Sequence, residues 1–163
     1  LFCTHLTAGL SSIEYSGEFG TWEKEQAQQI DAVIALVDTT AGAEAAVLIG
    51  DMNCGPTLPG LEPEMEDNYK KFLTGGFKNP YADAAGAKCT WCNDNTLHGE
   101  ADAKGPGGSI IDHIFMKNVD AALATARTAR VIDGLVEIDV ACKKKPVHVS
   151  DHYGLSVELD PGF

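Results

Sequence analysis

The chain has 163 residues, of which 24 are Asp or Glu and 12 are Lys or Arg, so its formal net charge is −12. This length suits a single domain, and a hydrophobic fraction of 44% argues against a disordered or fibrous chain. No apolar run approaches the roughly 18 to 20 residues that cross a bilayer. The acidic charge excludes a protein that holds nucleic acid by a broad basic surface, but not a nuclease that neutralises one phosphate with a metal ion.

Five cysteines are more than a cytosolic enzyme of this size usually carries, which favours an extracellular protein. Their number is odd and no secretory signal precedes Leu1, so the compartment stays open. The chain starts without Met inside an apolar stretch, and we expect it to begin downstream of the natural start. Cys89 and Cys92 have the spacing of a zinc or redox pair. The other cysteines show no paired spacing, so a disulfide, local or with a distant cysteine, is favoured over zinc.

The residue pattern in the first half of the chain predicts two strands and two helices. Leu1 to Leu6 has the pattern of a short buried strand. A helix follows from about Trp22 to Asp38, because Thr21 stands at its N-cap and apolar residues recur at helical spacing. The apolar run from Ala45 to Ile49 predicts a strand buried on both faces. The second helix is expected to start near Pro63 and stop at Gly75 and Gly76, with Met65, Tyr69, Phe72 and Leu73 facing inward.

The second half begins irregularly and then returns to strands. No regular pattern runs from Phe77 to Ser109, a region that includes a Gly-rich stretch from Gly105 to Gly108, and a loop that long is usually functional. The basic run Lys143 to Lys145 is expected to form a solvated turn, with contact to an anionic membrane surface or nucleic acid as the alternative. Strands are expected at Ile110 to Met116, Thr125 to Ile132, Leu135 to Val140 and Leu155 to Leu159.

Polar residues gather at the ends of the expected strands in four places. Taken singly, each has an ordinary structural explanation, because Asp and Asn favour turns and a lone His is usually structural. We interpret His113 as structural, expect His148 to face away from the core, and leave His98 open between substrate and solvent. The four places are Thr4 with His5, Asp51 with Asn53, Asp112, and Asp151 with His152.

Together these clusters resemble a known family. In order, the chain resembles the last three signature motifs of the endonuclease/exonuclease/phosphatase superfamily at Gly50-Asp51-Met52-Asn53, Ile111-Asp112-His113-Ile114 and Ser150-Asp151-His152-Tyr153-Gly154. The resemblance implies an α/β fold, a four-layer sandwich of two mixed β-sheets flanked by helices, with the active site at one rim. The family's N-terminal half has no counterpart before Leu1. Residues 1–163 are therefore expected to form the C-terminal part of a larger domain and to associate with its N-terminal portion.

The resemblance also implies a catalytic role for each polar side chain. His152 would be the general base that takes a proton from the attacking water, and Asp112 would orient its imidazole. Asp51 would orient the same water or help to deprotonate it, and Asn53 would donate a hydrogen bond to the phosphate. His5 would donate to a phosphate oxygen or assist the leaving group.

The family is metal-dependent, and its principal magnesium ligand is a Glu in the N-terminal half. In this chain the resemblance places Asp151 near the metal. Oxygen ligands of this kind suit Mg²⁺, with Ca²⁺ or Mn²⁺ as alternatives. A divalent ion would offset the negative charge of a phosphodiester, which otherwise repels the nucleophile.

Two stretches are similar to the neutral sphingomyelinase-like branch of the family. One is Thr4-His5-Leu6-Thr7-Ala8, and the other is Thr90-Trp91-Cys92 with Asn95, where the branch has Thr-Trp-Asp followed by Asn. Substrate contacts from Asn53, Trp91 and Asn95 are implied. The expected function is thus a metal-dependent phosphodiesterase acting on a phospholipid head group, sphingomyelin first, with contact to a membrane surface. The alternatives are a secreted deoxyribonuclease-like endonuclease acting on nucleic acid, and an inactive binding module.

Overall fold

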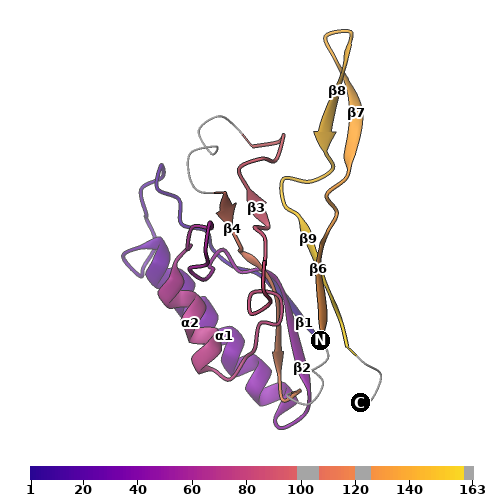
Figure 1. The fold of residues 1–163 in the computed structure, drawn as a ribbon. Coiled ribbons are helices and arrows are strands. Elements are labelled where there is room, and N and C mark those ends of the chain that lie inside the picture. Colours follow the sequence, from indigo (N-terminus) through magenta and orange to yellow (C-terminus); the bar gives the residue numbers. More distant parts are fainter. Residues whose placement is uncertain (99–106, 120–125, 160–163) are drawn as a thin grey trace.

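The computed structural model describes residues 1–98, 107–119 and 126–159. Figure 1 shows two helices on one side of a three-stranded sheet and a pair of strands on the other side. The structure therefore contains three of the four layers that the resemblance implied. The layer of paired strands is purely antiparallel in the described part of the chain, whereas the sheet under the helices is mixed.

The three-stranded sheet is built around one central strand. β2 (Ala46–Asp51) pairs in parallel with β1 (Phe2–His5) and antiparallel with β5 (Asp112–Lys117). These strands occupy the places that the apolar runs predicted. Gly50 in β2 has a φ of 143°, and a Cβ there would lie 1.8 Å from the carbonyl oxygen of Thr4. A side chain at this position would push β1 away from β2.

Both helices pack on one face of this sheet. α1 (Trp22–Ala41) starts as predicted, and the Thr21 hydroxyl accepts a hydrogen bond of 3.1 Å from the Lys24 amide. α2 (Glu66–Thr74) lies against α1 and ends at Gly75. At the centre of the core, the rings of Phe72 and Phe115 stack at 4.6 Å. The buried partners around them include Ile30, Val37, Leu48, Tyr69 and Phe77.

Two expectations about α2 are wrong. The helix begins at Glu66 rather than near Pro63, because Met65 takes a left-handed conformation at the N-cap. Leu73 is 40% exposed rather than inward. Tyr69 and Phe72 are buried, and the residue after Phe72 is turned roughly 100° around the helix axis, toward solvent.

The chain after the irregular region forms two antiparallel strand pairs. β6 (Arg127–Val131) pairs with β9 (Gly154–Glu158), and β7 (Leu135–Val140) pairs with β8 (Lys143–His148) in a hairpin that projects from the body of the molecule (Figure 1). The expectation of a lysine turn is wrong, because Lys143 to Lys145 belong to β8. The turn consists of Ala141 and Cys142, both with positive φ, as two-residue hairpin loops require.

The irregular region contains only short strands in its described part. β3 (Trp91–Cys92) pairs with β4 (Gly108–Ser109). Gly105, in the predicted Gly-rich stretch, and Thr125, the predicted start of a strand, lie outside the described residues. Neither described helix has the length and apolarity needed to cross a membrane.

His113 is buried in the core and serves a structural purpose, as the sequence indicated. Its Nε2 lies 2.7 Å from the Cys54 carbonyl oxygen, and its Nδ1 lies 2.8 Å from the amide nitrogen of Asn79. A neutral ring with the proton on Nε2 satisfies both partners. Burial lowers the pKa of His113 to about 4.

This depressed pKa predicts a loss of stability in acid. An unfolded His113 binds a proton below its ordinary pKa of 6.5, whereas the folded one resists until about pH 4. The free energy of unfolding should therefore fall by about 3 kcal/mol from this group as the pH drops through that window. Urea unfolding across this window measures the loss, which His113→Gln should remove. An equal pH dependence in both proteins would contradict the prediction.

Candidate active site

Three of the predicted site residues meet because of strand register. Asp51 at the end of β2 is paired with His5 in β1 and with Asp112 in β5. Their side chains lie on the sheet face opposite the helices, and His5 Nε2 is 3.3 Å from Asp51 Oδ2. Residues that are far apart in sequence thus gather at one rim of the sheet.

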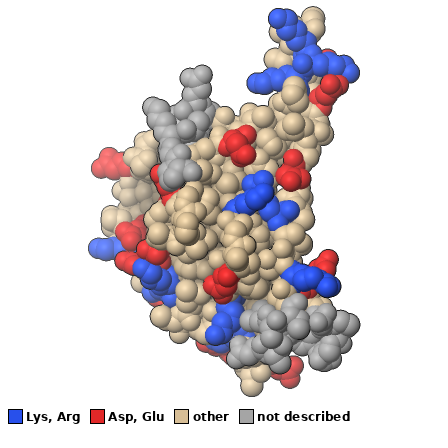
Figure 2. Space-filling model, in the orientation of Figure 1, with Lys and Arg blue, Asp and Glu red and all other residues tan. Residues whose placement is uncertain are grey.

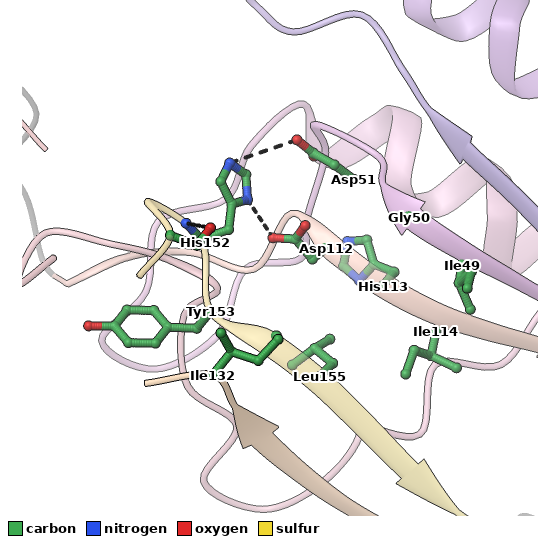
Figure 3. A pocket seen from close by; sticks show the side chains of 12 residues that line it. Ile49, Gly50, Asp51, Asp112, His113, Ile114, Ile132, His152, Tyr153 and Leu155 are labelled. Carbon is green, nitrogen blue, oxygen red and sulfur yellow. Dashed lines mark hydrogen bonds and ion pairs between the residues drawn. The ribbon is translucent and has the colours of Figure 1, made fainter. Parts of the chain in front are cut away.

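His152 completes this group from the turn before β9. Its Nδ1 lies 2.8 Å from Asp112 Oδ2, and its Nε2 lies 4.0 Å from Asp51 Oδ2 (Figure 3). The hydrogen bond that His152 donates to Asp112 raises the pKa of His152 and outweighs burial, which lowers it. Because Nδ1 donates to Asp112, Nε2 is left to accept a proton. It faces the Asp51 carboxylate across a gap in which one water molecule could bond to both.

The surroundings of Asp51 raise the pKa of its carboxyl group. Burial is the largest cause, and the negative charge of Asp112 adds to it. The amide of Asn53 opposes the shift by donating a 2.9 Å hydrogen bond to Asp51 Oδ1. Asn53 has a φ of 47°, and its side-chain amide donates to the Leu6 carbonyl. The turn after β2 therefore fixes Asp51 and Asn53 together.

The turn that carries His152 is tied to the irregular region. The Tyr153 amide donates a 2.8 Å hydrogen bond to the Thr90 carbonyl. The side-chain amide of Asn95 donates to the carbonyls of Ser150 and Asp151, at 2.9 and 3.2 Å. Asn95 is only 3% exposed. These bonds hold the turn that carries His152 in place, and the substrate contact of Asn95 that the resemblance implied stays a prediction.

Thr90 links this turn to β5, the strand that carries Asp112. Its hydroxyl accepts hydrogen bonds from the amides of Ile111 and Asp112, at 3.0 and 3.1 Å. A disulfide joins Cys89 to Cys92 on either side of it, so the favoured disulfide is present and is local. Thr90 was expected only as part of a motif, and its positioning role depends on burial and hydrogen bonds that the sequence does not show.

Trp91 lies directly beside the histidine. Its ring meets His152 edge-on, with centroids 4.8 Å apart. The His98 ring packs against the same tryptophan, with ring centroids 3.8 Å apart, so His98 lies near the site. His148 does not point away into solvent, because its ring contacts Thr96 and the Tyr153 hydroxyl.

A cavity of about 290 Å³ adjoins the histidine and the two carboxylates. Figure 3 shows that Asp51, Asp112 and His152 stand at one end of it. An apolar wall consists of Ile49, Ile114, Ile132 and Leu155. Such a wall lowers the local dielectric constant and strengthens the interactions among the charged groups beside it.

The charged cluster has part of the character of a divalent metal site. Asp51, Asp112 and His152 each offer one atom that could bind a metal ion, and these three atoms lie within 4.8 Å of one another. Carboxylate oxygens suit Mg²⁺ or Ca²⁺. Burial, and after it the charge of Asp112, raises the pKa of Asp51, and a bound cation would favour its ionised form. Asp151 is exposed and lies outside this group, so its contact with a metal stays a prediction.

The Asp112 to His152 contact predicts a measurable shift in titration. Asp112→Asn removes the main cause of the raised pKa, so the pKa of His152 should fall. Asp151→Asn is the matched control, because Asp151 acts only through its charge and contributes least. An NMR titration of the His152 ring in each protein gives the answer. An equal fall of the His152 pKa in both variants would show that the hydrogen bond to Asp112 is not the main cause of the raised pKa.

Comparison with known proteins identifies the fold. A scan of protein-family models and a search of curated proteins both find no match to this chain. Solved structures do match: SmcL (TM-score 0.67, 21% identity), an AP endonuclease from Archaeoglobus fulgidus (0.64, 18%) and sphingomyelinase C from Streptomyces griseocarneus (0.58, 17%). These matches cover 96%, 97% and 96% of this chain but 51%, 60% and 51% of the others, so it spans about half of their length. The chain has the fold of the endonuclease/exonuclease/phosphatase superfamily, whose sphingomyelinase-like members are among these neighbours.

Proposed function

We propose that this protein is a metal-dependent phosphodiesterase that activates water with a histidine base. The observation that carries this proposal is the hydrogen bond of 2.8 Å between His152 Nδ1 and Asp112, together with the Asp51 carboxylate opposite Nε2. An oriented base facing a second carboxylate can hold and deprotonate an attacking water. The fold shared with phosphodiesterases supports the same reaction.

In this proposal each residue has a defined task. His152 Nε2 takes the proton of the attacking water, and Asp112 stabilises the imidazolium that forms. Asp51 holds the water in line with the phosphorus. His5 and Asn53 donate hydrogen bonds to phosphate oxygens, where negative charge increases in the transition state.

A divalent ion at the cluster would be held by Asp51 and approached by Asp151. Such an ion, when bound, offsets the charge of the phosphodiester. The chain spans about half of its structural neighbours, so we also propose that another portion of the domain completes the ligand set. Among the described residues β1 pairs only with β2, which leaves its other edge available to such a portion.

The substrate we favour is a phospholipid head group, with sphingomyelin as the first candidate. The stretches around His5 and Trp91 resemble the sphingomyelinase-like branch, and the fold matches sphingomyelinase C. The second candidate is a nuclease, because the fold matches an AP endonuclease with a TM-score of 0.64. Both candidates use the same catalytic residues.

A hydrolysis assay tests this proposal. The protein, together with any further portion of its natural chain, is given sphingomyelin, plasmid DNA and a simple phosphodiester with Mg²⁺. His152→Ala and Asp51→Asn should each lower turnover by about 100-fold or more, because each removes a group that acts on the water. Asp133→Asn, an exposed carboxylate outside the site, should have no effect.

The outcomes separate the candidates. Cleavage of the lipid that is lost in His152→Ala supports the favoured substrate. Cleavage of DNA alone keeps the mechanism and changes the substrate to nucleic acid. Absence of turnover on all three would overturn the enzymatic proposal in favour of a binding module.

We further propose that the projecting hairpin contacts an anionic membrane surface. Cross-strand partners share a face, so the exposed Val136, Ile138 and Val140 lie with Lys143 and Lys145. Figure 2 shows basic side chains gathered at the end of this hairpin, away from the body of the molecule. Apolar side chains flanked by lysines are typical of segments that bind anionic lipid.

The two faces of the hairpin allow a matched test. Lys145→Gln removes a charge from the apolar face, whereas Lys144→Gln removes one that pairs with Glu137 at 3.0 Å on the opposite face. Sedimentation with vesicles containing phosphatidylserine should weaken about fivefold for Lys145→Gln and little for Lys144→Gln. Equal losses, or equal binding to neutral vesicles, would contradict a docking face.

A further inference from the structure

A second cavity, of about 360 Å³, begins at His152 and continues away from the carboxylate cluster. Its lining includes His152, Asn53, residues 8–12, Trp91 and Glu64, together with Ser109 and Ile111. This volume lies at the small end of the range for ligand pockets, which is about 300 to 1,000 Å³. A group attached to a phosphorus atom near His152 would therefore occupy this space.

Glu64 is the one carboxylate among the described residues that line this cavity, and no Lys or Arg is among them. Its side chain is partly buried, and within the described part of the chain it has no hydrogen-bond or ion-pair partner. Burial raises its pKa, and the nearby charge of Glu62 raises it further. A partly desolvated carboxylate without a partner is costly, and a bound cation would compensate it.

The backbone holds Glu64 firmly in place. Its carbonyl accepts a 2.6 Å hydrogen bond from the Gly55 amide. A Cβ on Gly55 would lie 1.9 Å from the Ile110 carbonyl oxygen, so this segment is pressed against the strand that leads to Asp112. On the other side, Gly9 brings the loop of residues 8–12 close, since a Cβ there would lie 3.2 Å from Glu64 Oε1. The Glu64 backbone is thus fixed beside the cavity, and its carboxylate lines the wall.

We propose that this cavity is a subsite for a positively charged organic group of the substrate, with Glu64 and Trp91 as its specificity-determining residues. This inference rests on the proposed function for the place of the phosphorus. An ammonium or quaternary ammonium group suits a carboxylate beside an indole, because both attract cations. A second phosphate of a nucleic acid would be repelled by Glu64. The subsite therefore selects phosphoesters of cationic alcohols over polynucleotides.

Ligand titration tests this subsite without any need for turnover, so its result is independent of whether the protein hydrolyses phosphodiesters. The protein has two tryptophans, and in a Trp22→Phe background all tryptophan emission comes from Trp91. The probes are choline and 3,3-dimethylbutanol, which have the same shape but differ in charge. Choline should change the emission at a concentration several-fold lower than the neutral alcohol.

Two variants and a control make the test decisive. Glu64→Gln should weaken choline binding by roughly three- to tenfold and leave the alcohol unchanged. Ser11→Lys, which brings a cation into the same cavity, should also weaken choline. Glu62→Gln removes an exposed charge two residues away and should keep the preference. Equal binding of both probes, no response to choline, or a preference that survives Glu64→Gln in a folded protein would overturn the subsite.

Discussion

The register of β2 against its two neighbours is the constraint on which the site depends. One paired row across the sheet contains His5, Asp51 and Asp112, so their spacing is set by backbone hydrogen bonds and not by the side chains. A slip of one residue would turn Asp51 toward the helices and into the aromatic core. The contact of Gly50 with Thr4 opposes such a slip, because only glycine allows the strands to approach so closely there.

His152 is not part of this row of paired residues. Hydrogen bonds from the irregular region hold the turn that carries it beside Asp112. Thr90 binds the backbone at both members of the Asp112–His152 pair: its hydroxyl accepts from the Asp112 amide, and its carbonyl accepts from the Tyr153 amide. Asn95 fixes the turn just before His152. The hydrogen bond between Asp112 and His152 is therefore supported by buried polar groups that do not themselves face the cavity.

Sequence reasoning predicted the features that depend on local pattern. The apolar run of β2, the cap at Thr21 and the polar residues at strand ends all carry their signal within a few residues. Leu73 was misjudged because the inward face of a short helix is set by what it packs against. The lysines of β8 were misjudged because cross-strand pairing, and not composition, holds them in a strand.

The positioning and subsite residues could not be read from the sequence for a related reason. Asn95 and Glu64 act through contacts with segments that are distant along the chain: the turn before β9 for Asn95, and the loop of residues 8–12 for Glu64. Nothing in their neighbouring letters marks them as different from other polar loop residues. The burial of these side chains, and the backbone groups that Asn95 binds, become visible only in three dimensions.

The local disulfide has a consequence for the response of the site to reductants. Cys89 and Cys92 enclose Thr90, which binds the Asp112 amide, and Trp91, which contacts His152, and both cysteines are buried with Tyr153. Reduction of the bond would remove the covalent link across this segment and leave its backbone held by hydrogen bonds alone. A thiol reductant therefore acts on the segment that supports Asp112 and His152, and not on the sheet that carries Asp51.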